Sequence, residues 1–198
     1  MAAIAVAGVG LMMMCSSSVA AAMMMGGEAK EIDGGDISGA GAGSATTPKT
    51  PVVPTLPSGQ YVKLVQTSLT DVINLAELEV FAKAGTTNLA AGKTVTSSAF
   101  HSVGPGSYLV DGVITGYNFA HTMNEVADTE DSMLIDLGSV QEIEKIKITN
   151  RTDCCTERAI GIKVVILGAD GTTVIKETTA ITTDAATYTF TFPGTAWV

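Results

Sequence analysis

The second half of the sequence predicts an all-β fold, a sandwich or jelly roll. Thr, Val, Ile and Gly are plentiful there, and these residues favour strands and the turns between them. Short apolar runs of strand length follow one another with turn signals between them, and no amphipathic helix pattern interrupts them. At 198 residues the chain is long enough for one ordinary domain with additional segments.

The expected strands are recognised by their patterning and by the turns that separate them. Residues 61–66 alternate between apolar and polar side chains, and in residues 73–81 we expect the apolar face on the odd positions. Turn sequences such as Asp111-Gly112 and Ala169-Asp170-Gly171 mark the ends of later segments. The remaining expected strands are residues 133–137, 143–149, 160–167, 173–177 and 187–192.

The N-terminal segment is apolar, and residues 2–27 carry no charge. This run is about long enough to cross a bilayer as a helix, and its small residues allow close helix packing. A cleaved secretory signal is the alternative, because Ala20-Ala21-Ala22 offers a small-residue cleavage site. A signal usually has a basic first region, whereas the first cation here is Lys30. We therefore expect residues 1–27 to form a transmembrane anchor, with a signal peptide as the alternative.

A linker is expected between this anchor and the β domain. Residues 28–59 are rich in Gly, Ala and Pro, which predicts a flexible stretch followed by a polyproline-like spacer. The β domain then occupies residues 60–198. An anchor followed by a stalk indicates that the domain is held away from a membrane.

Composition excludes several classes of function. The net charge of −9, with no basic stripe, argues against nucleic-acid binding. Three cysteines are too few for a disulfide framework. No Ser-His-Asp order, phosphate loop or paired acid stands in a catalytic context. We therefore expect a protein that is not an enzyme.

The most informative motif, residues 150–158, directly follows an expected strand. Two arginines flank two adjacent cysteines, and an aspartate lies two residues after the first arginine. Two planar guanidinium groups held in one loop suit vicinal hydroxyls, carboxylates or phosphates. The alternative is an ion-pair network that only braces the loop. The residues concerned are Arg151, Asp153, Cys154, Cys155 and Arg158.

Five segments of the chain carry a resemblance to a known family. They are residues 88–98, 109–112, 121–122, 135–138 and 150–158. They resemble the galactose-binding-like, discoidin-type jelly rolls, and among these the F-type lectins (fucolectins). The sugar site of that family reads His, then Arg-x-Asp, then a second basic residue. Arg151, Asp153 and Arg158 keep the family's spacing, whereas His121 lies further upstream than the pattern expects.

The resemblance implies a carbohydrate site in the loop and its surroundings. Arg151 and Arg158 would donate hydrogen bonds to a deoxy sugar such as fucose, and His121 would add a further one. Asp153 would orient an arginine through a charge-assisted bond. If oxidised, Cys154 and Cys155 would present a flat apolar surface to the sugar.

The resemblance also implies a structural calcium ion, because similar lectins hold one on loop carbonyls and carboxylates. The side-chain ligands here would be Glu77, Asp111 and Asn118. The backbone carbonyls of Tyr108 and Val113 would complete the shell. The alternative is that Asp111-Gly112 is only a tight turn and Glu77 a solvated strand residue.

The order of the segments departs from the family. The strand that closes an F-type lectin at its C-terminal end corresponds here to residues 76–80, near the start of the domain. We therefore expect a circular permutation, which domains tolerate when their termini are close. The permutation predicts that Val198 ends near Tyr61. An unrelated strand pair over residues 61–81 is the alternative.

Two hypotheses for the whole protein follow. The family's disulfide positions correspond to Ala76 and Phe119, so that staple is absent, which fits a chain not matured in an oxidising compartment. Together with the Met- and Ala-rich N-terminus and the permutation, this resembles virion proteins of giant DNA viruses. We expect a membrane-anchored, lectin-like module that binds fucosylated or related glycans on a virion, or alternatively on a cell surface. The second hypothesis is a structural minor capsid protein whose jelly roll docks other capsid proteins and whose N-terminus anchors in the viral membrane.

Overall fold

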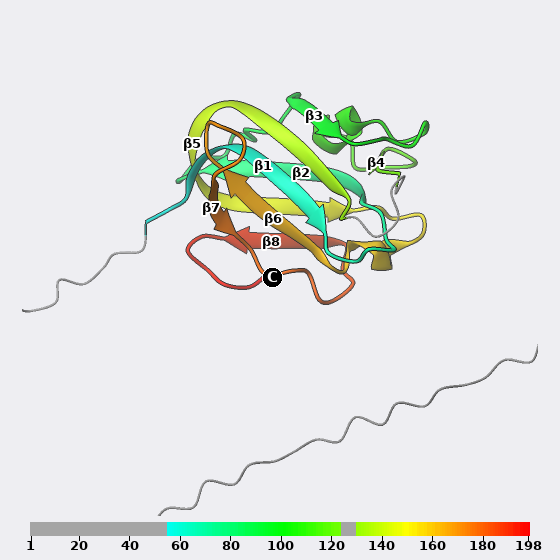
Figure 1. Ribbon diagram of the computed structural model, residues 1–198. Helices are drawn as coiled ribbons and strands as arrows, with labels where there is room; N and C mark the ends of the chain where they lie inside the picture. Colours follow the sequence, from blue (N-terminus) through cyan, green and yellow to red (C-terminus); the bar gives the residue numbers. More distant parts are fainter. Residues whose placement is uncertain (1–54, 124–129) are drawn as a thin grey trace, which may run out of the picture. The chain divides into compact units, whose positions relative to one another are not determined.

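The computed structural model describes residues 55–123 and 130–198. These residues form one eight-stranded antiparallel sheet that curls on itself (Figure 1). The predicted all-β class is therefore confirmed. The strands are β1 (Ser58–Gln66), β2 (Asn74–Ala82), β3 (Thr94–Ser97), β4 (Ala120–His121), β5 (Ser132–Asn150), β6 (Ile162–Leu167), β7 (Val174–Glu177) and β8 (Thr187–Thr191), with short 3-10 helices η1 (Gly106–Val110) and η2 (Thr156–Ala159).

The predicted membrane anchor, residues 1–27, and most of the linker lie outside the described residues. Among residues 55–123 and 130–198, no helix is long and apolar enough to cross a bilayer.

Strand β5 links the two halves of the sheet and gives the fold its curl. Its first part pairs with β1 and β3, and its second part pairs with β2 and β8 (Figure 1). The sequence predicted two strands here, residues 133–137 and 143–149, but the structure has a single strand of 19 residues. Gly138, which lies between the two predicted segments, adopts a φ of +86° within the strand and lets the chain bend and continue.

Strand β2 contains an irregularity that changes which side chains reach the core. Ile73 and Leu75, near the start of the strand, are buried in the core, and so are Leu78 and Val80 further along it. The sequence predicted that the core side chains of this segment would stand at odd-numbered positions. That prediction is wrong beyond Leu75, where the buried core residues are Leu78 and Val80. The ladder with β5 shifts register between Leu75 and Glu77, and such a bulge moves the later side chains to the other parity. The buried position of Glu77 follows from this shift.

The main core lies inside the curl, between the two halves of the sheet. Fully buried side chains arrive from both halves, including Leu64 on β1, Leu78 on β2 and Phe190 on β8. On β5, Ile135 in the first part and Ile146 in the second belong to the same cluster. Each such side chain contributes about 1.5–3 kcal/mol on burial. This core holds the ends of β2, β4 and β5 in fixed positions.

The end of the chain turns back and pairs with β8. The amide and carbonyl of Val198 both hydrogen-bond with Thr189, whereas Tyr61 pairs within the β1 ladders to β5 and β6. The two ends of the domain approach each other a few residues before Val198. Residues 55–58 and 192–193 line the same pocket. The circular permutation therefore stays a hypothesis, with the meeting point at Phe192 and Pro193 instead of Val198.

Candidate functional site

The loop that follows β5 is held in shape by Asn150, the last residue of the strand. Its side-chain amide donates to the carbonyl oxygens of Thr156 and Ala185 at 2.9 and 3.1 Å. Its side-chain oxygen accepts from the backbone N–H of Arg151 at 2.9 Å. Asn150 is fully buried, so these bonds are shielded from water and fix the start of the loop.

Arg151 is anchored on two sides. Its Nε and Nη2 donate to the two carboxylate oxygens of Asp153 at 2.7 and 2.6 Å, which is a bidentate pair. Its guanidinium carbon lies 3.8 Å from the ring centroid of Phe119. The bonds from Arg151 lower the pKa of Asp153 to about 2, so this carboxylate stays ionised under ordinary conditions. Only 7% of the Arg151 side chain is exposed, along a shallow pocket of about 320 Å³.

Asn74, at the start of β2, joins the two arginines. In the amide orientation that satisfies both of its ends, its oxygen accepts from Nη1 of Arg151 at 3.0 Å and from Nη1 of Arg158 at 3.2 Å. Asn74 is fully buried, whereas Arg158 is half-buried. The buried side-chain oxygen of Asn74 therefore sets the spacing between the guanidinium groups of Arg151 and Arg158.

His121 lies on β4, directly opposite Asn74 in the β2–β4 ladder. Burial lowers the pKa of His121 below its ordinary value, and the nearby His101, Arg158 and Arg151 lower it further, while the hydrogen bond to Thr122 opposes the shift. His121 is therefore neutral at pH 7. Its Nδ1 contacts the carbonyl oxygen of Thr122, which can only accept, so Nδ1 carries the hydrogen. Nε2 then carries no hydrogen and is a hydrogen-bond acceptor.

The two adjacent cysteines belong to the same loop. Cys154 is exposed and Cys155 is partly buried, and both are free thiols in the structure. A hydrogen bond between the two thiols raises the pKa of Cys154. The flat disulfide surface implied by the family resemblance thus stays a prediction that depends on oxidation.

A second cluster forms after η1, where the sequence predicted calcium ligands. Asn118 Nδ2 donates to both carboxylate oxygens of Asp111 at 3.0 and 3.1 Å, and to the carbonyl oxygen of Val113 at 2.8 Å. Asp111 Oδ1 also accepts from the backbone N–H of Val113. Three oxygens thus surround one electropositive NH₂ group. Tyr108 lies close by in η1, three residues before Asp111.

Glu77 lies beside this cluster and is only 2% exposed. Its Oε2 accepts from the backbone N–H of Gly112 at 3.1 Å, whereas its buried Oε1 meets no hydrogen-bond partner among the residues that the structure describes. Burial, with smaller contributions from Asp111 and Glu79, raises the pKa of Glu77 to about 7. A buried carboxylate oxygen without a partner is costly, so this side chain fits a site that receives a cation.

The cluster does not have the make-up of a transition-metal site. In the part of the chain that the structure describes, no group of three or more His, Cys, Asp or Glu side chains could hold a metal ion. The groups beside the Glu77 carboxylate are instead the carboxylate of Asp111, the side-chain amide of Asn118 and the backbone carbonyl of Val113. Such a set of hard oxygen donors is typical for calcium.

The structure brings together His121, Arg151, Asp153 and Arg158, and separately Glu77, Asp111, Val113 and Asn118. Three contributors to the first group were not identified from the sequence: Asn74, Phe119 and His101, whose ring centroid lies 5.1 Å from that of His121. A lone Asn within an apolar strand was an available signal for Asn74. Phe119 and His101 had no comparable signal, because their partners come from distant segments.

The comparisons with known proteins agree with this architecture. Residues 108–197 match the family model described as the NedA-like, galactose-binding domain. The match extends from η1 through β4 to the segment after β8, and it includes the loop of residues 150–158. Neither the curated proteins nor the solved structures contain a match. Residues 108–197 therefore match the F5/F8 type C, galactose-binding-like domain, and the curled antiparallel β-sheet that contains them is consistent with a discoidin-like fold.

Proposed function

We propose that this protein is a carbohydrate-binding module whose binding site is formed by His121, Arg151 and Arg158. Discoidin-like galactose-binding domains are generally non-catalytic binding modules, and the family match supports carbohydrate ligands in general. The observation that carries the proposal is the convergence of both arginines on Asn74, directly opposite His121. These side chains come from three separate segments of the chain and meet at one end of the sheet.

The donors and acceptors of this site complement vicinal hydroxyl groups. Arg158 is half-buried and offers guanidinium N–H groups beyond the one that Asn74 receives. Neutral His121 offers Nε2 as an acceptor, so one sugar hydroxyl can accept from Arg158 and donate to His121. Arg151 is held by Asp153 and Phe119 before any ligand arrives, which lowers the entropic cost of binding. A deoxy sugar such as fucose has such hydroxyls together with an apolar methyl group.

We further propose that a structural calcium ion occupies the cluster around Glu77. The unpartnered Oε1 of Glu77 and the oxygens of Asp111 and Val113 support this assignment. If the Asn118 amide turned by half a rotation, its oxygen would join them. The carbonyl of Tyr108 would add a further ligand. The ion would neutralise two carboxylates and hold the loop that leads into β4.

Display of the module at a membrane, on a virion or on a cell surface, is also part of the proposal. It rests on the uncharged residues 2–27 and the Pro- and Gly-rich linker that follows them. Both features belong to the sequence, and residues 2–27 and most of the linker lie outside the described ranges.

A glycan array probed with the full chain tests the carbohydrate proposal. We expect binding to fucosylated glycans, and we expect Arg158→Ala to weaken it by at least about tenfold through the loss of a charge-assisted hydrogen bond. The matched control, Lys176→Ala, removes an exposed cation on β7 and leaves binding unchanged. Absence of binding to every fucosylated glycan would contradict the fucose assignment, and absence of binding to any glycan would contradict the module itself.

A structural role is the second candidate, and one observation favours it. Arg151 is 93% shielded from solvent, and its donors already meet Asp153 and Asn74, so it can brace the loop without a ligand. In that case the domain would dock other capsid proteins as a minor capsid component. A particle reconstruction with the loop of residues 150–158 buried against a neighbouring subunit would favour this role over glycan binding.

A further inference from the structure

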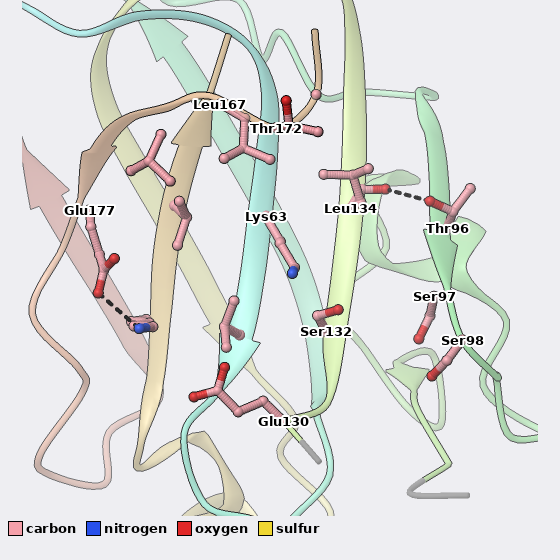
Figure 2. A pocket seen from close by; sticks show the side chains of 15 residues that line it. Lys63, Thr96, Ser97, Ser98, Glu130, Ser132, Leu134, Leu167, Thr172 and Glu177 are labelled. Carbon is pink, nitrogen blue, oxygen red and sulfur yellow. Dashed lines mark hydrogen bonds and ion pairs between the residues drawn. The ribbon is translucent and has the colours of Figure 1, made fainter. Parts of the chain in front are cut away.

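An open groove of about 610 Å³ crosses the outer face of the first half of the sheet (Figure 2). Strands β3, β5, β1, β6 and β7 contribute side chains to it. Along β1, Val62 and Leu64 point into the main core, so Lys63 and Val65 point outward. We name this feature the sheet-face groove and define it by Lys63, Val65, Ser132, Leu134, Val165 and Glu177.

Five groove residues form a continuous row across the strands. Thr96 on β3 pairs with Leu134 on β5, which pairs with Lys63 on β1. Lys63 in turn pairs with Val165 on β6, which pairs with Glu177 on β7. Neighbouring strands are about 4.8 Å apart, so the row extends over about 19 Å. A ligand along it would meet a hydroxyl, an apolar side chain, a cation, a second apolar side chain and a carboxylate.

The floor of the groove is apolar. Val65, Val165 and Leu167 form a small cluster separate from the main core, and they are 3%, 6% and 6% exposed. Tyr61 and Leu134 pack against this cluster and are partly buried. The floor is therefore an apolar strip with polar groups at its sides, which is the usual composition of a ligand site.

Lys63 lies in the middle of the groove and is half-buried (Figure 2). Within residues 55–123 and 130–198, its ammonium group makes no hydrogen bond or ion pair. Lys163, by contrast, lies 2.8 Å from the carboxylate of Glu177. The hydroxyl of Ser132, on the neighbouring strand, also makes no hydrogen bond with the described part of the chain. The centre of the groove thus holds polar groups whose bonding capacity is not used by residues 55–123 and 130–198.

We propose that the sheet-face groove binds a neutral, hydroxyl-rich chain, namely an oligosaccharide segment that lies along the row. Its charged lining residues are two lysines, Lys63 and Lys163, and two glutamates, Glu130 and Glu177, so their formal charges cancel. A polyanion would gain no net attraction there. The backbone groups beneath the groove are paired in the ladders, so an added peptide strand has no partner on this face. A sugar chain can accept from Lys63, donate to a carboxylate, and lay its C–H face on Val165.

This groove is separate from the loop site. None of its lining residues belongs to the group of His121, Arg151 and Arg158. The inference therefore does not rest on the function proposed for that loop, and one site can fail while the other holds.

Calorimetric titration of the full chain with cellohexaose, laminarihexaose and xylohexaose tests the proposal. Lys63→Met keeps the apolar stem and removes the cation, whereas the control Lys176→Met removes an exposed cation on β7 outside the groove. We expect at least one hexasaccharide to bind, and we expect Lys63→Met to weaken that binding by about tenfold, or about 1.4 kcal/mol. Lys176→Met and Arg158→Ala should leave it unchanged.

Several outcomes would overturn the proposal. One is the absence of binding with all three hexasaccharides. Another is a loss of binding in Arg158→Ala equal to that in Lys63→Met, because the sugar would then occupy the loop site. The groove could instead be covered by the chain's own linker or by a second copy. A synthetic peptide of residues 28–57 that binds the wild type but not Lys63→Met, or a dimer in sedimentation that Lys63→Met dissociates, would assign it to those occupants.

Discussion

The guanidinium group of Arg151 lies on the ring of Phe119, with 3.8 Å between its central carbon and the ring centroid. Phe119 directly follows Asn118, whose amide is bonded to the carboxylate of Asp111. Two adjacent residues thus reach the two candidate sites, one holding the arginine and the other holding the proposed calcium cluster. This relationship makes the stability of the segment before β4 important for both.

Replacing Phe119 by Leu should destabilise the domain by about 1–2 kcal/mol, because a buried cation–π contact and part of the packing are lost. Urea unfolding of the full chain measures the change. The matched control is Phe81→Leu, where Lys145 lies 4.3 Å from the centroid of a more exposed ring. We expect a smaller loss there, and equal losses at both positions would contradict a special role for the Arg151 contact.

Replacing Asn74 by Ala should cost about 2 kcal/mol of stability, because two guanidinium groups lose a shared buried acceptor. Glycan binding should weaken in the same variant, since the spacing of Arg151 and Arg158 is no longer set. Asn74→Asp keeps an acceptor in place and should retain most of both properties. Thermal melts and a glycan titration of the two variants decide this, and equal damage from Ala and Asp would argue against the acceptor role.

Calcium should stabilise the wild-type chain by about 2.7 kcal/mol at a hundredfold excess over its dissociation constant. Glu77→Gln should abolish most of that increment, because the buried carboxylate is then neutral and can no longer balance the ion. Without calcium, the same variant should be as stable as the wild type or slightly more stable, since it buries no unpaired charge. A melting series with calcium and with a chelator measures all of these values. An equal calcium increment in both proteins would remove Glu77 from the site.

Calcium removal should also weaken glycan binding, because Asn118 and Phe119 are adjacent and Phe119 supports Arg151. Titrations of the same glycan with calcium and with chelator measure the difference. Magnesium at the same concentration is the control, since it demands a smaller and more regular octahedral shell. Identical affinities in all three conditions would show that the two clusters are independent.

Acidification should weaken glycan binding through His121. Burial lowers the pKa of this residue below its ordinary value of 6.5, so the neutral ring with its acceptor Nε2 persists somewhat below that pH. Because the folded pKa is below the unfolded one, its contribution to stability is fully present above about pH 6.5 and declines as the pH falls through the folded pKa. Titrations and urea midpoints across this range should show both effects. The effect on glycan binding should be absent in His121→Gln, and a binding affinity that still falls on acidification of that variant would assign the effect to another group.

The local sequence already determined several of the strands and the position of the arginine loop. Alternation and turn signals predicted β1, β6 and β8 closely, because side-chain period and glycine-containing turns are properties of neighbouring residues. The pairing of Arg151 with Asp153 is also local, since the two residues are two positions apart and the carboxylate reaches both N–H groups. The departure of His121 from the family spacing could also be read from the sequence, because this spacing is a number of residues along the chain.

Only the tertiary structure decided which distant residues complete these features. Gly138 could end a strand or bend one, and the pairing of β5 with four neighbours makes it a bend. Asn74 becomes the acceptor for two arginines because the start of β2 packs beside the end of β5. The sheet-face groove depends on the register of five strands, and long-range register is set by core packing and not by neighbouring residues. The chain therefore encodes its elements locally, whereas its sites arise from contacts between segments that are far apart in sequence.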